Sequence, residues 1–219
     1  MNKIYISPSI LSSDFANLEK EIKRLEDNGA DWIHVDVMDG HFVNNITIGA
    51  PVVKALRKVT SIVLDVHLMI DNPEMYIEDF ALAGSDIITF HYEAAKDNCD
   101  KVIQKIKSFN KKAGISIKPK TPVKEIIPFL NSVDLVLIMT VEPGFAGQSF
   151  IYNCAEKIEE LKKHINNVNP ALQNIIIQVD GGINNKTAEI CKQKGANSLV
   201  SGNYIFSHEN IKKAIDSLR

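Results

Sequence analysis

Two histidines and two aspartates in this sequence are of the residue types that bind transition metals, and each follows or ends an apolar, strand-like segment. His34 and Asp36 lie in WIHVDVM, His67 lies in LDVHLM, and Asp180 lies in VDGGI. Because side chains alternate between the two faces of a strand, His34 and Asp36 share one face. Imidazole and carboxylate ligands together suit Zn²⁺, Fe²⁺, Mn²⁺ or Co²⁺. The four residues therefore predict a site for one divalent transition metal.

Each of these side chains also has a purely structural interpretation. Either histidine could be a core residue with satisfied hydrogen bonds, and Asp180 could cap a helix. For one histidine alone, we favour the structural interpretation. For the whole set we favour the metal, because all four stand at the ends of predicted strands, where barrel enzymes carry their functional groups.

Three glycine-containing segments indicate a second kind of site, for an anion. They are EPGFAGQ (142–148), DGGI (180–183) and SGN (201–203), and each follows a predicted strand. Loops at such positions bind phosphate through backbone N–H groups. None of the three contains Lys or Arg, so backbone donors would make the contact. The glycines could also serve only to make tight turns, but three such loops on adjacent strands favour an anion pocket.

Three methionines end three different predicted strands: Met38, Met69 and Met139. Methionine is soft and adaptable. These side chains could fill the core, or they could form a floor beneath a flexible reaction intermediate. The sequence leaves both interpretations open.

The elements that must position these residues alternate between short strands rich in β-branched residues and amphipathic helical stretches. Helical patterns include residues 14–29, 72–84 and 153–167, and Gly29, Gly84 and Gly195 stand where helices end. The predicted strands lie near residues 4–9, 32–37, 62–68, 87–91, 114–117, 135–139, 175–179 and 198–201. Eight strands and eight helical segments in strict alternation predict an α/β fold, the (β/α)8 TIM barrel with a closed parallel sheet. No linker is visible, so we expect a single barrel domain over residues 1–219.

Composition restricts the class of protein further. The formal net charge of −2 gives no general attraction to nucleic acid or to an anionic membrane. No apolar run approaches the roughly 20 residues that cross a bilayer, and the N-terminus does not resemble a signal peptide. The three cysteines lie far apart without paired spacing, which fits a reducing compartment. We expect a cytoplasmic protein that binds neither nucleic acid nor membrane.

A metal, two carboxylates and a phosphate pocket together suit epimerisation next to a carbonyl group. A metal chelated by the carbonyl and the adjacent hydroxyl oxygen would stabilise an enediolate. One carboxylate can remove the proton next to the carbonyl. A second carboxylate on the other face can return a proton and invert the configuration.

The segments SPSILSSDF, HVDVMDGHFV, LDVHLM, MTVEPGFAGQSF and VDGGIN closely resemble the ribulose-phosphate 3-epimerase family. The resemblance runs in order from Ser7 to about Phe206. It implies interconversion of D-ribulose 5-phosphate and D-xylulose 5-phosphate in the pentose phosphate pathway, by an isomerase that forms homo-oligomers.

The resemblance also implies roles for individual residues. His34, Asp36, His67 and Asp180 look like the metal ligands. Asp36 resembles the proton acceptor and Asp180 the proton donor in the ribulose-to-xylulose direction. The residues that resemble substrate contacts are Ser9, His67, Gly144, Phe145, Ala146, Gly147, Gly181, Gly182, Gly202 and Asn203.

Three positions differ from the usual family motifs. Asn44 stands in place of a proline, Ala146 in place of a glycine, and Asn203 lies in SGNYIF where AGSAIF is more usual. A Cβ at position 146 requires a negative φ angle.

Three alternatives have a specific basis in the sequence. The related allulose-6-phosphate 3-epimerases share the GFAGQ form but usually depart from DGGI. A metal-dependent aldolase would use Lys118, which follows the fifth predicted strand. A non-catalytic barrel that binds a sugar phosphate is the third, although such a protein has no need of two opposed carboxylates.

Overall fold

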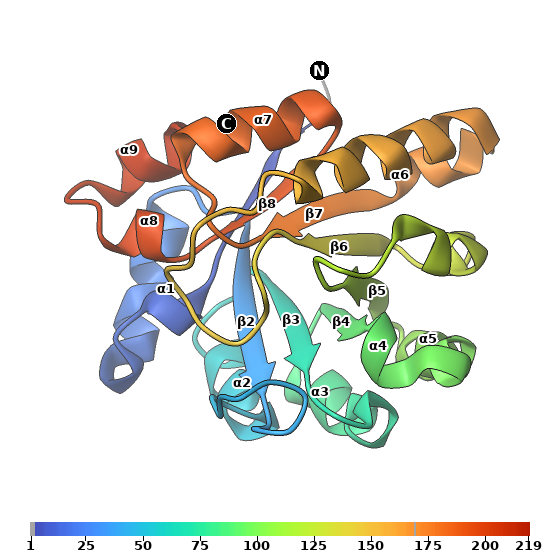
Figure 1. The fold of residues 1–219 in the computed structure, drawn as a ribbon. Helices are drawn as coiled ribbons and strands as arrows, with labels where there is room; N and C mark the ends of the chain where they lie inside the picture. The colour runs from blue at the N-terminus through green and yellow to red at the C-terminus, as the bar shows by residue number, and fades with distance from the viewer. Residues whose placement is uncertain (1–2, 169) are drawn as a thin grey trace.

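The protein, described here by a computed structural model, forms one sheet of eight parallel strands wrapped by helices (Figure 1). The structure describes residues 3–168 and 170–219. The strands are paired in the order β1-β8-β7-β6-β5-β4-β3-β2. Their bounds are Tyr5–Pro8 (β1), Trp32–Met38 (β2), Val63–Met69 (β3), Ile87–His91 (β4), Lys112–Ile117 (β5), Leu135–Met139 (β6), Ile176–Asp180 (β7) and Ser198–Ser201 (β8).

The two end strands of this order also approach one another. A parallel bridge joins Ser9, directly after β1, to His34 in β2. The sheet is therefore nearly closed into a barrel, and every observed strand overlaps its predicted range. The predicted TIM-barrel fold is confirmed.

The helices follow the strands in the expected alternation, with one exception. Their bounds are Leu18–Asp27 (α1), Ala50–Arg57 (α2), Ile77–Ala83 (α3), Tyr92–Ala95 (α4), Cys99–Ser108 (α5), Cys154–Val168 (α6), Asn185–Lys194 (α7), Asn203–Phe206 (α8) and Ile211–Asp216 (α9). Between β5 and β6 the chain forms only two 3₁₀ turns, Val123–Glu125 and Ile127–Phe129, so the expectation of a helix in every unit is wrong there. Pro128 lies inside the second turn and has no N–H group, which prevents a continuous helix. Further 3₁₀ turns are Ile10–Ser12, Phe15–Asn17, Pro73–Met75, Lys96–Asn98 and Pro170–Asn174.

Glycines end three of the helices as predicted. Gly29, Gly84 and Gly195 have φ angles of 88°, 104° and 111°, respectively. Only glycine adopts this region readily, so these residues turn the chain from each helix toward the next strand.

The strand period of two explains where the polar residues of β2 point. Ile33, Val35 and Val37 lie in the main hydrophobic core with the residues of the surrounding helices. His34 and Asp36 alternate with them and face the interior of the barrel. The interior is therefore the place where polar groups from different strands meet.

The barrel interior changes from apolar to polar along the strands. At the amino-terminal ends of the strands, Tyr5 and Trp32 stack with ring centroids 4.7 Å apart, and Trp32 packs in a cluster with Ile87 and Leu135. The next inward position along β1 is Ser7, which is fully buried. The apolar end closes the barrel, and the polar groups lie toward the carboxyl ends of the strands.

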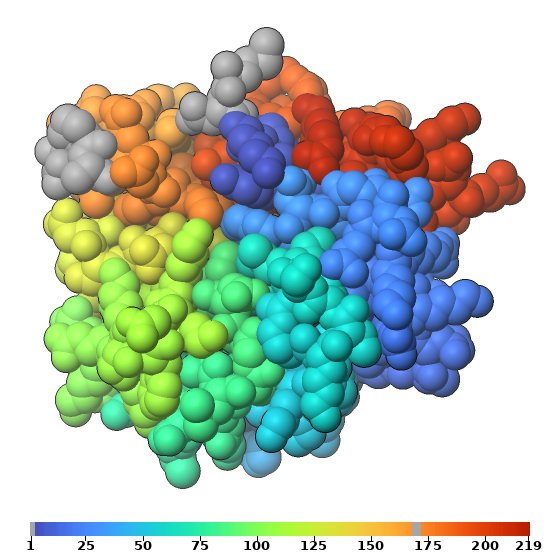
Figure 2. Space-filling model, turned by 180° about the vertical axis from the view of Figure 1, so that it is seen from behind, coloured from blue at the N-terminus to red at the C-terminus, as the bar shows by residue number. Residues whose placement is uncertain are grey.

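Arg219 contacts residues that directly precede β1 and β2. Arg219 binds Asp31 at 2.9 Å and the carbonyl of Ile4 at 3.1 Å. Figure 2 shows the amino-terminal and carboxyl-terminal segments side by side on the rear face.

The long segment between β6 and α6 extends toward the end of β2 (Figure 1), where the Asn45 amide donates to the Gly144 carbonyl at 2.8 Å. Among the described residues, no helix has the length and apolar character needed to cross a membrane.

Candidate active site

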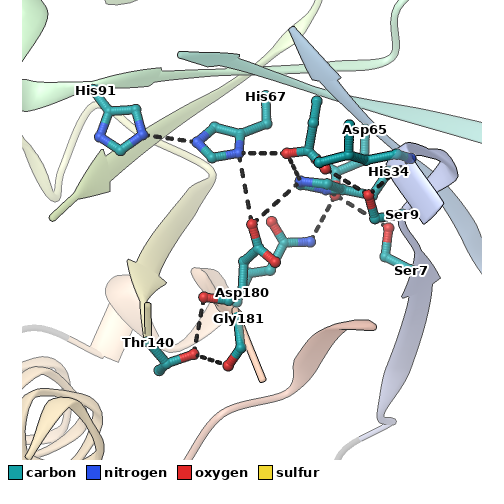
Figure 3. Close-up of polar contacts among 12 residues, drawn as sticks. Ser7, Ser9, His34, Asp65, His67, His91, Thr140, Asp180 and Gly181 are labelled. Carbon is teal, nitrogen blue, oxygen red and sulfur yellow. Dashed lines mark hydrogen bonds and ion pairs between the residues drawn. The ribbon is translucent and has the colours of Figure 1, made fainter. Parts of the chain in front are cut away.

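The four residues predicted as metal ligands converge from β2, β3 and β7. Figure 3 labels three of them, His34, His67 and Asp180. One donor atom from each of His34, Asp36, His67 and Asp180 lies within 4.8 Å of the others. The Oδ1 atom of Asp36 is 3.2 Å from His34 Nε2 and 3.1 Å from His67 Nδ1. The same two nitrogens are each 3.9 Å from Asp180 Oδ2. Two nitrogens and two oxygens thus surround one point.

This arrangement fits a divalent cation. Buried His34 Nε2 has no hydrogen-bond partner within the described chain. An unprotonated imidazole nitrogen and a carboxylate oxygen repel one another when they face each other, unless a cation lies between them. The four side chains could hold a metal ion, and their mixed nitrogen and oxygen donors suit a transition metal.

The ring nitrogen of His34 that points away from the cluster, Nδ1, contacts Asp65, a residue for which no role was predicted. His34 Nδ1 lies 2.8 Å from Asp65 Oδ2. The same oxygen accepts hydrogen bonds from Gln178 Nε2 at 2.7 Å and Ser7 Oγ at 3.2 Å. A carboxylate there holds the proton on Nδ1 and leaves the Nε2 lone pair directed at the cluster. Asp65 stands two residues before His67 in LDVHLM, and this spacing already places both on one strand face.

The ring nitrogen of His67 that points away from the cluster, Nε2, also has a buried partner, His91. His67 Nε2 lies 2.9 Å from His91 Nε2, and His91 Nδ1 lies 3.1 Å from Glu93 Oε2. His67 and His91 have no exposed surface. Burial lowers the pKa of His67 and lowers the pKa of His91 to about 4, in both cases despite neighbouring carboxylates. Both rings are therefore neutral at physiological pH.

The protein environment shifts the pKa values of the two carboxyl groups, Asp36 and Asp180, in opposite directions. Burial raises the pKa of Asp36, but the close approach of His34 and His67 outweighs this and holds the pKa far below its usual value. Burial and the nearby charge of Asp36 raise the pKa of Asp180. Ser9 Oγ donates to Asp36 Oδ2 at 2.5 Å and fixes the orientation of the ionised group. Neighbouring carboxyls with pKa values pushed apart are suited to act as base and acid.

A cavity of about 570 Å³ opens above the cluster. Asp36 and Asp180 reach its surface, whereas His34 and His67 lie buried beneath it. No Lys or Arg is among the described residues that line it. The remaining predicted site residues all line this cavity: Ser9, Met38, Met69, Met139, Gly144, Phe145, Ala146, Gly147, Gly181, Gly182, Gly202 and Asn203.

Comparison with known proteins identifies the family. The family model described as "Ribulose-phosphate 3 epimerase family" matches residues 5–206. The chain belongs to the ribulose-phosphate 3-epimerase family. It is 49% identical over 216 residues to the ribulose-phosphate 3-epimerase of Bacillus subtilis, covering 99% of this chain and 98% of that protein. It is 48% identical over 217 residues to the cytoplasmic isoform of Oryza sativa, covering 98% and 92%.

Solved structures of more distant proteins share the fold of this epimerase-family chain. A 3-hexulose-6-phosphate synthase superimposes with a TM-score of 0.69 at 14% identity, covering 99% of this chain and 98% of that one. KGPDC from Streptococcus mutans gives a TM-score of 0.72 at 12% identity, covering 99% and 96%. At these identities the similarity concerns the barrel alone.

The loops of the family motifs leave backbone donors available. Within the described chain, the N–H groups of Gly182, Gly202 and Asn203 form no hydrogen bond. Ala146, the departure from the family glycine, is not among the non-glycine residues with positive φ, so its Cβ is tolerated. These three N–H groups can therefore donate to an anion in the cavity.

We expect Gly182→Ala to weaken both stability and substrate binding. Gly182 has a φ of 68°, and a Cβ there would lie 2.5 Å from the backbone nitrogen of Phe150. Gly147→Ala is the matched control, because its φ is 76° but its Cβ would meet nothing within 4 Å. The φ strain costs about 1–3 kcal/mol in either variant. Denaturant unfolding and KM measurements should show a further loss only for Gly182→Ala, and equal losses in both would contradict the clash.

Proposed function

We propose that this chain is an isomerase that inverts C3 of a ketose phosphate and interconverts D-ribulose 5-phosphate and D-xylulose 5-phosphate. One observation carries the proposal beyond family membership: two carboxyl groups with oppositely shifted pKa values, Asp36 and Asp180, meet at the base of one cavity. Epimerisation requires one group that removes a proton and a second that supplies one to the opposite face.

The acid and base roles follow from the two environments. Asp36 is ionised and removes the C3 proton of D-ribulose 5-phosphate. Asp180, whose pKa is raised, holds a proton and delivers it to the other face of the planar enediolate. In the reverse direction the two residues exchange roles. Ser9 keeps the Asp36 carboxylate aligned through its hydrogen bond to Oδ2.

The metal proposal rests on His34, Asp36, His67 and Asp180 as ligands. A divalent transition metal bound there (Zn, Fe, Mn or Co), one per subunit, supplies Lewis-acid stabilisation of the negative charge that develops on the substrate oxygens. The chain's own contribution is to hold both imidazoles in one tautomer and to exclude water. Met38, Met69 and Met139 support the second task, because they present apolar surface at the base of the cavity while being at most 4% exposed.

Substrate contacts are proposed on the same basis. The uncharged loops after β6, β7 and β8 supply backbone N–H groups for the phosphate, because no cationic side chain of the described chain lines the cavity. Ser9 lines the cavity beside Asp36, on the side proposed for the reacting carbons, whereas His67, the other predicted substrate contact, lies buried beneath the cavity. The phosphate group thus anchors the substrate at one end, with C3 between the two carboxyls.

The proposal extends to the pathway, the cellular compartment and the oligomeric state. We place the reaction in the pentose phosphate pathway and the protein in the cytoplasm, as a homo-oligomer built from single barrel domains of residues 1–219. The curated relative from Oryza sativa is named as a cytoplasmic isoform. Cys99, Cys154 and Cys191 are free and buried, which accords with a reducing compartment.

The alternatives have less support. Lys118, the residue an aldolase would use, places its ammonium 3.7 Å from the ring centroid of Phe42 and does not line the cavity. The retained DGGI motif favours the five-carbon substrate over D-allulose 6-phosphate. A non-catalytic sugar-phosphate barrel would not require the opposed carboxyls. The deciding experiment is side-by-side turnover of D-ribulose 5-phosphate and D-allulose 6-phosphate, and absence of C3 inversion in both would refute an epimerase.

We expect free D-ribulose to be a poor substrate. Binding energy from the phosphate helps to position the reacting carbon, so kcat should fall as well as KM rise. We expect kcat/KM for free D-ribulose to be about 100-fold lower or more, because the reacting carbon is no longer held in position by the phosphate. Steady-state kinetics on both sugars test this, and comparable kcat/KM values would argue against a phosphate pocket.

A further inference from the structure

A line of three side chains, two fully buried and the third partly buried, leads away from the proposed metal centre. It begins at His67, passes through His91 at the end of β4 and ends at Glu93 in α4 (Figure 3 shows the first two). The two contacts measure 2.9 Å and 3.1 Å. Neither His91 nor Glu93 lines the cavity, so neither touches substrate.

Glu93, at the far end of this line, only accepts hydrogen bonds. Glu93 Oε1 accepts from the backbone N–H of Lys118 at 2.7 Å and from the Thr121 hydroxyl. Glu93 Oε2 faces His91 Nδ1. A carboxylate held by these donors is ionised and has no proton to give. His91 Nδ1 must therefore carry the hydrogen of that contact.

This assignment fixes the next contact. When His91 carries its hydrogen on Nδ1, its Nε2 is an acceptor. The 2.9 Å contact then requires the hydrogen on His67 Nε2. His67 Nδ1 is left with a free lone pair, 3.1 Å from Asp36 Oδ1 and directed into the cluster. The line of hydrogen bonds thus sets which nitrogen of His67 can bind a metal.

We propose that His91 and Glu93 are positioning residues that hold His67 in the Nε2–H tautomer and so keep Nδ1 available as a metal ligand. The inference rests on the proposed metal site. It assigns a role to residues that form no part of the ligand set. Partners of this kind orient a ligand and tune its basicity, and their loss commonly costs about 10–100-fold in metal affinity.

The surroundings of His91 leave its ring little freedom to turn. The Phe42 ring lies against it with centroids 4.8 Å apart, and Lys118 covers Phe42. Lys118 also supplies the backbone N–H that binds Glu93. The elements after β2, β4 and β5 therefore hold one hydrogen-bonded line in place.

Glu93→Gln tests the proposal with almost no change of shape. The Lys118 N–H can only donate, so it selects the amide oxygen at the Oε1 position. The amide NH₂ group then faces His91 Nδ1 and donates to it. His91 must donate from Nε2 to His67 Nε2, and the hydrogen of His67 moves to Nδ1, where it blocks the metal. The substitution reverses every hydrogen bond in the line without removing one.

The primary readout is metal affinity, measured by chelator competition with Zn²⁺ on the full-length protein. We expect Glu93→Gln to bind Zn²⁺ about 10–100-fold more weakly than wild type. Glu125→Gln is the matched control, because it removes the same charge from a carboxylate that accepts from Tyr92, the neighbour of His91. The control should keep wild-type affinity. Long-range ¹H–¹⁵N correlation spectra of the metal-free proteins should show the hydrogen of His91 on Nδ1 in wild type and on Nε2 in Glu93→Gln.

Each outcome separates this inference from the proposed function. If wild type binds no divalent metal, the metal part of the proposed function fails, while the spectra still test the tautomers. If wild type binds Zn²⁺ and Glu93→Gln binds it equally well, or if its His91 keeps the hydrogen on Nδ1, the positioning role is overturned.

A second pair of variants covers the case in which Glu93→Gln does not fold. The amide oxygen of His91→Gln can accept from His67 Nε2–H, whereas His91→Leu offers no acceptor. We expect the Gln variant to retain clearly tighter Zn²⁺ binding than the Leu variant. Equal losses in both would show that His91 only fills space.

Discussion

Protein freed of divalent metal by prolonged chelation is expected to have no measurable epimerase activity, and a divalent transition metal should restore it. The reason lies in the cluster itself. His34 Nε2 and His67 Nδ1 face the same carboxylate oxygen of Asp36 at 3.2 Å and 3.1 Å. Without a bound cation, the cavity offers no positively charged group to the substrate oxygens on which negative charge builds up, because no Lys or Arg of the described chain lines it. The measurement is activity against metal content through removal and readdition.

Two controls make this result specific. Circular dichroism of the metal-free protein should retain the signal of the barrel, so that loss of activity is not loss of fold. Mg²⁺ should restore less activity than Zn²⁺, Mn²⁺, Fe²⁺ or Co²⁺, since imidazole nitrogen ligands suit transition metals. Full turnover in a preparation that elemental analysis shows to be metal-free would remove the metal from the mechanism.

The barrel and the ligand cluster could be predicted because both follow from local periodicity. Alternation within WIHVDVM places His34 and Asp36 on one face, and alternation of strands with helices brings the carboxyl ends together. Gly29, Gly84 and Gly195 marked three of the helix ends through a backbone angle that other residues avoid.

The partners of the ligands could not be predicted in the same way. The contact between Asp65 and His34 joins two strands, and the one between His67 and His91 joins another two. Such pairs depend on the register between strands and on side-chain rotamers, which periodicity does not determine. Asp65 and His91 therefore remained without a role until their distances were known. The missing helix after β5 had a local signal in Pro128, which the expectation of strict alternation outweighed.

Asp180→Asn is expected to lower kcat for epimerisation by about 10²–10⁴-fold, the usual cost of a lost general acid or base. Asn is close in size to Asp but cannot deliver a proton to the second face. Asp36 remains and can still remove the C3 proton of D-ribulose 5-phosphate and return it to the same face. In D₂O this variant should therefore exchange the C3 hydrogen of one epimer without inverting it. Wild type should instead place deuterium at C3 of the product from the first turnover.

Because Asp180 is also a proposed metal ligand, the metal content of the variant must be measured with its kinetics. Asp79→Asn, an exposed carboxylate in the first turn of α3, serves as the matched surface control and should behave as wild type. An enzyme with a single acid/base group behaves differently, since that group carries the substrate hydrogen across to the product. Substantial transfer of the substrate's own C3 hydrogen into product in a single turnover would therefore exclude separate roles for Asp36 and Asp180, even if the metal were still required.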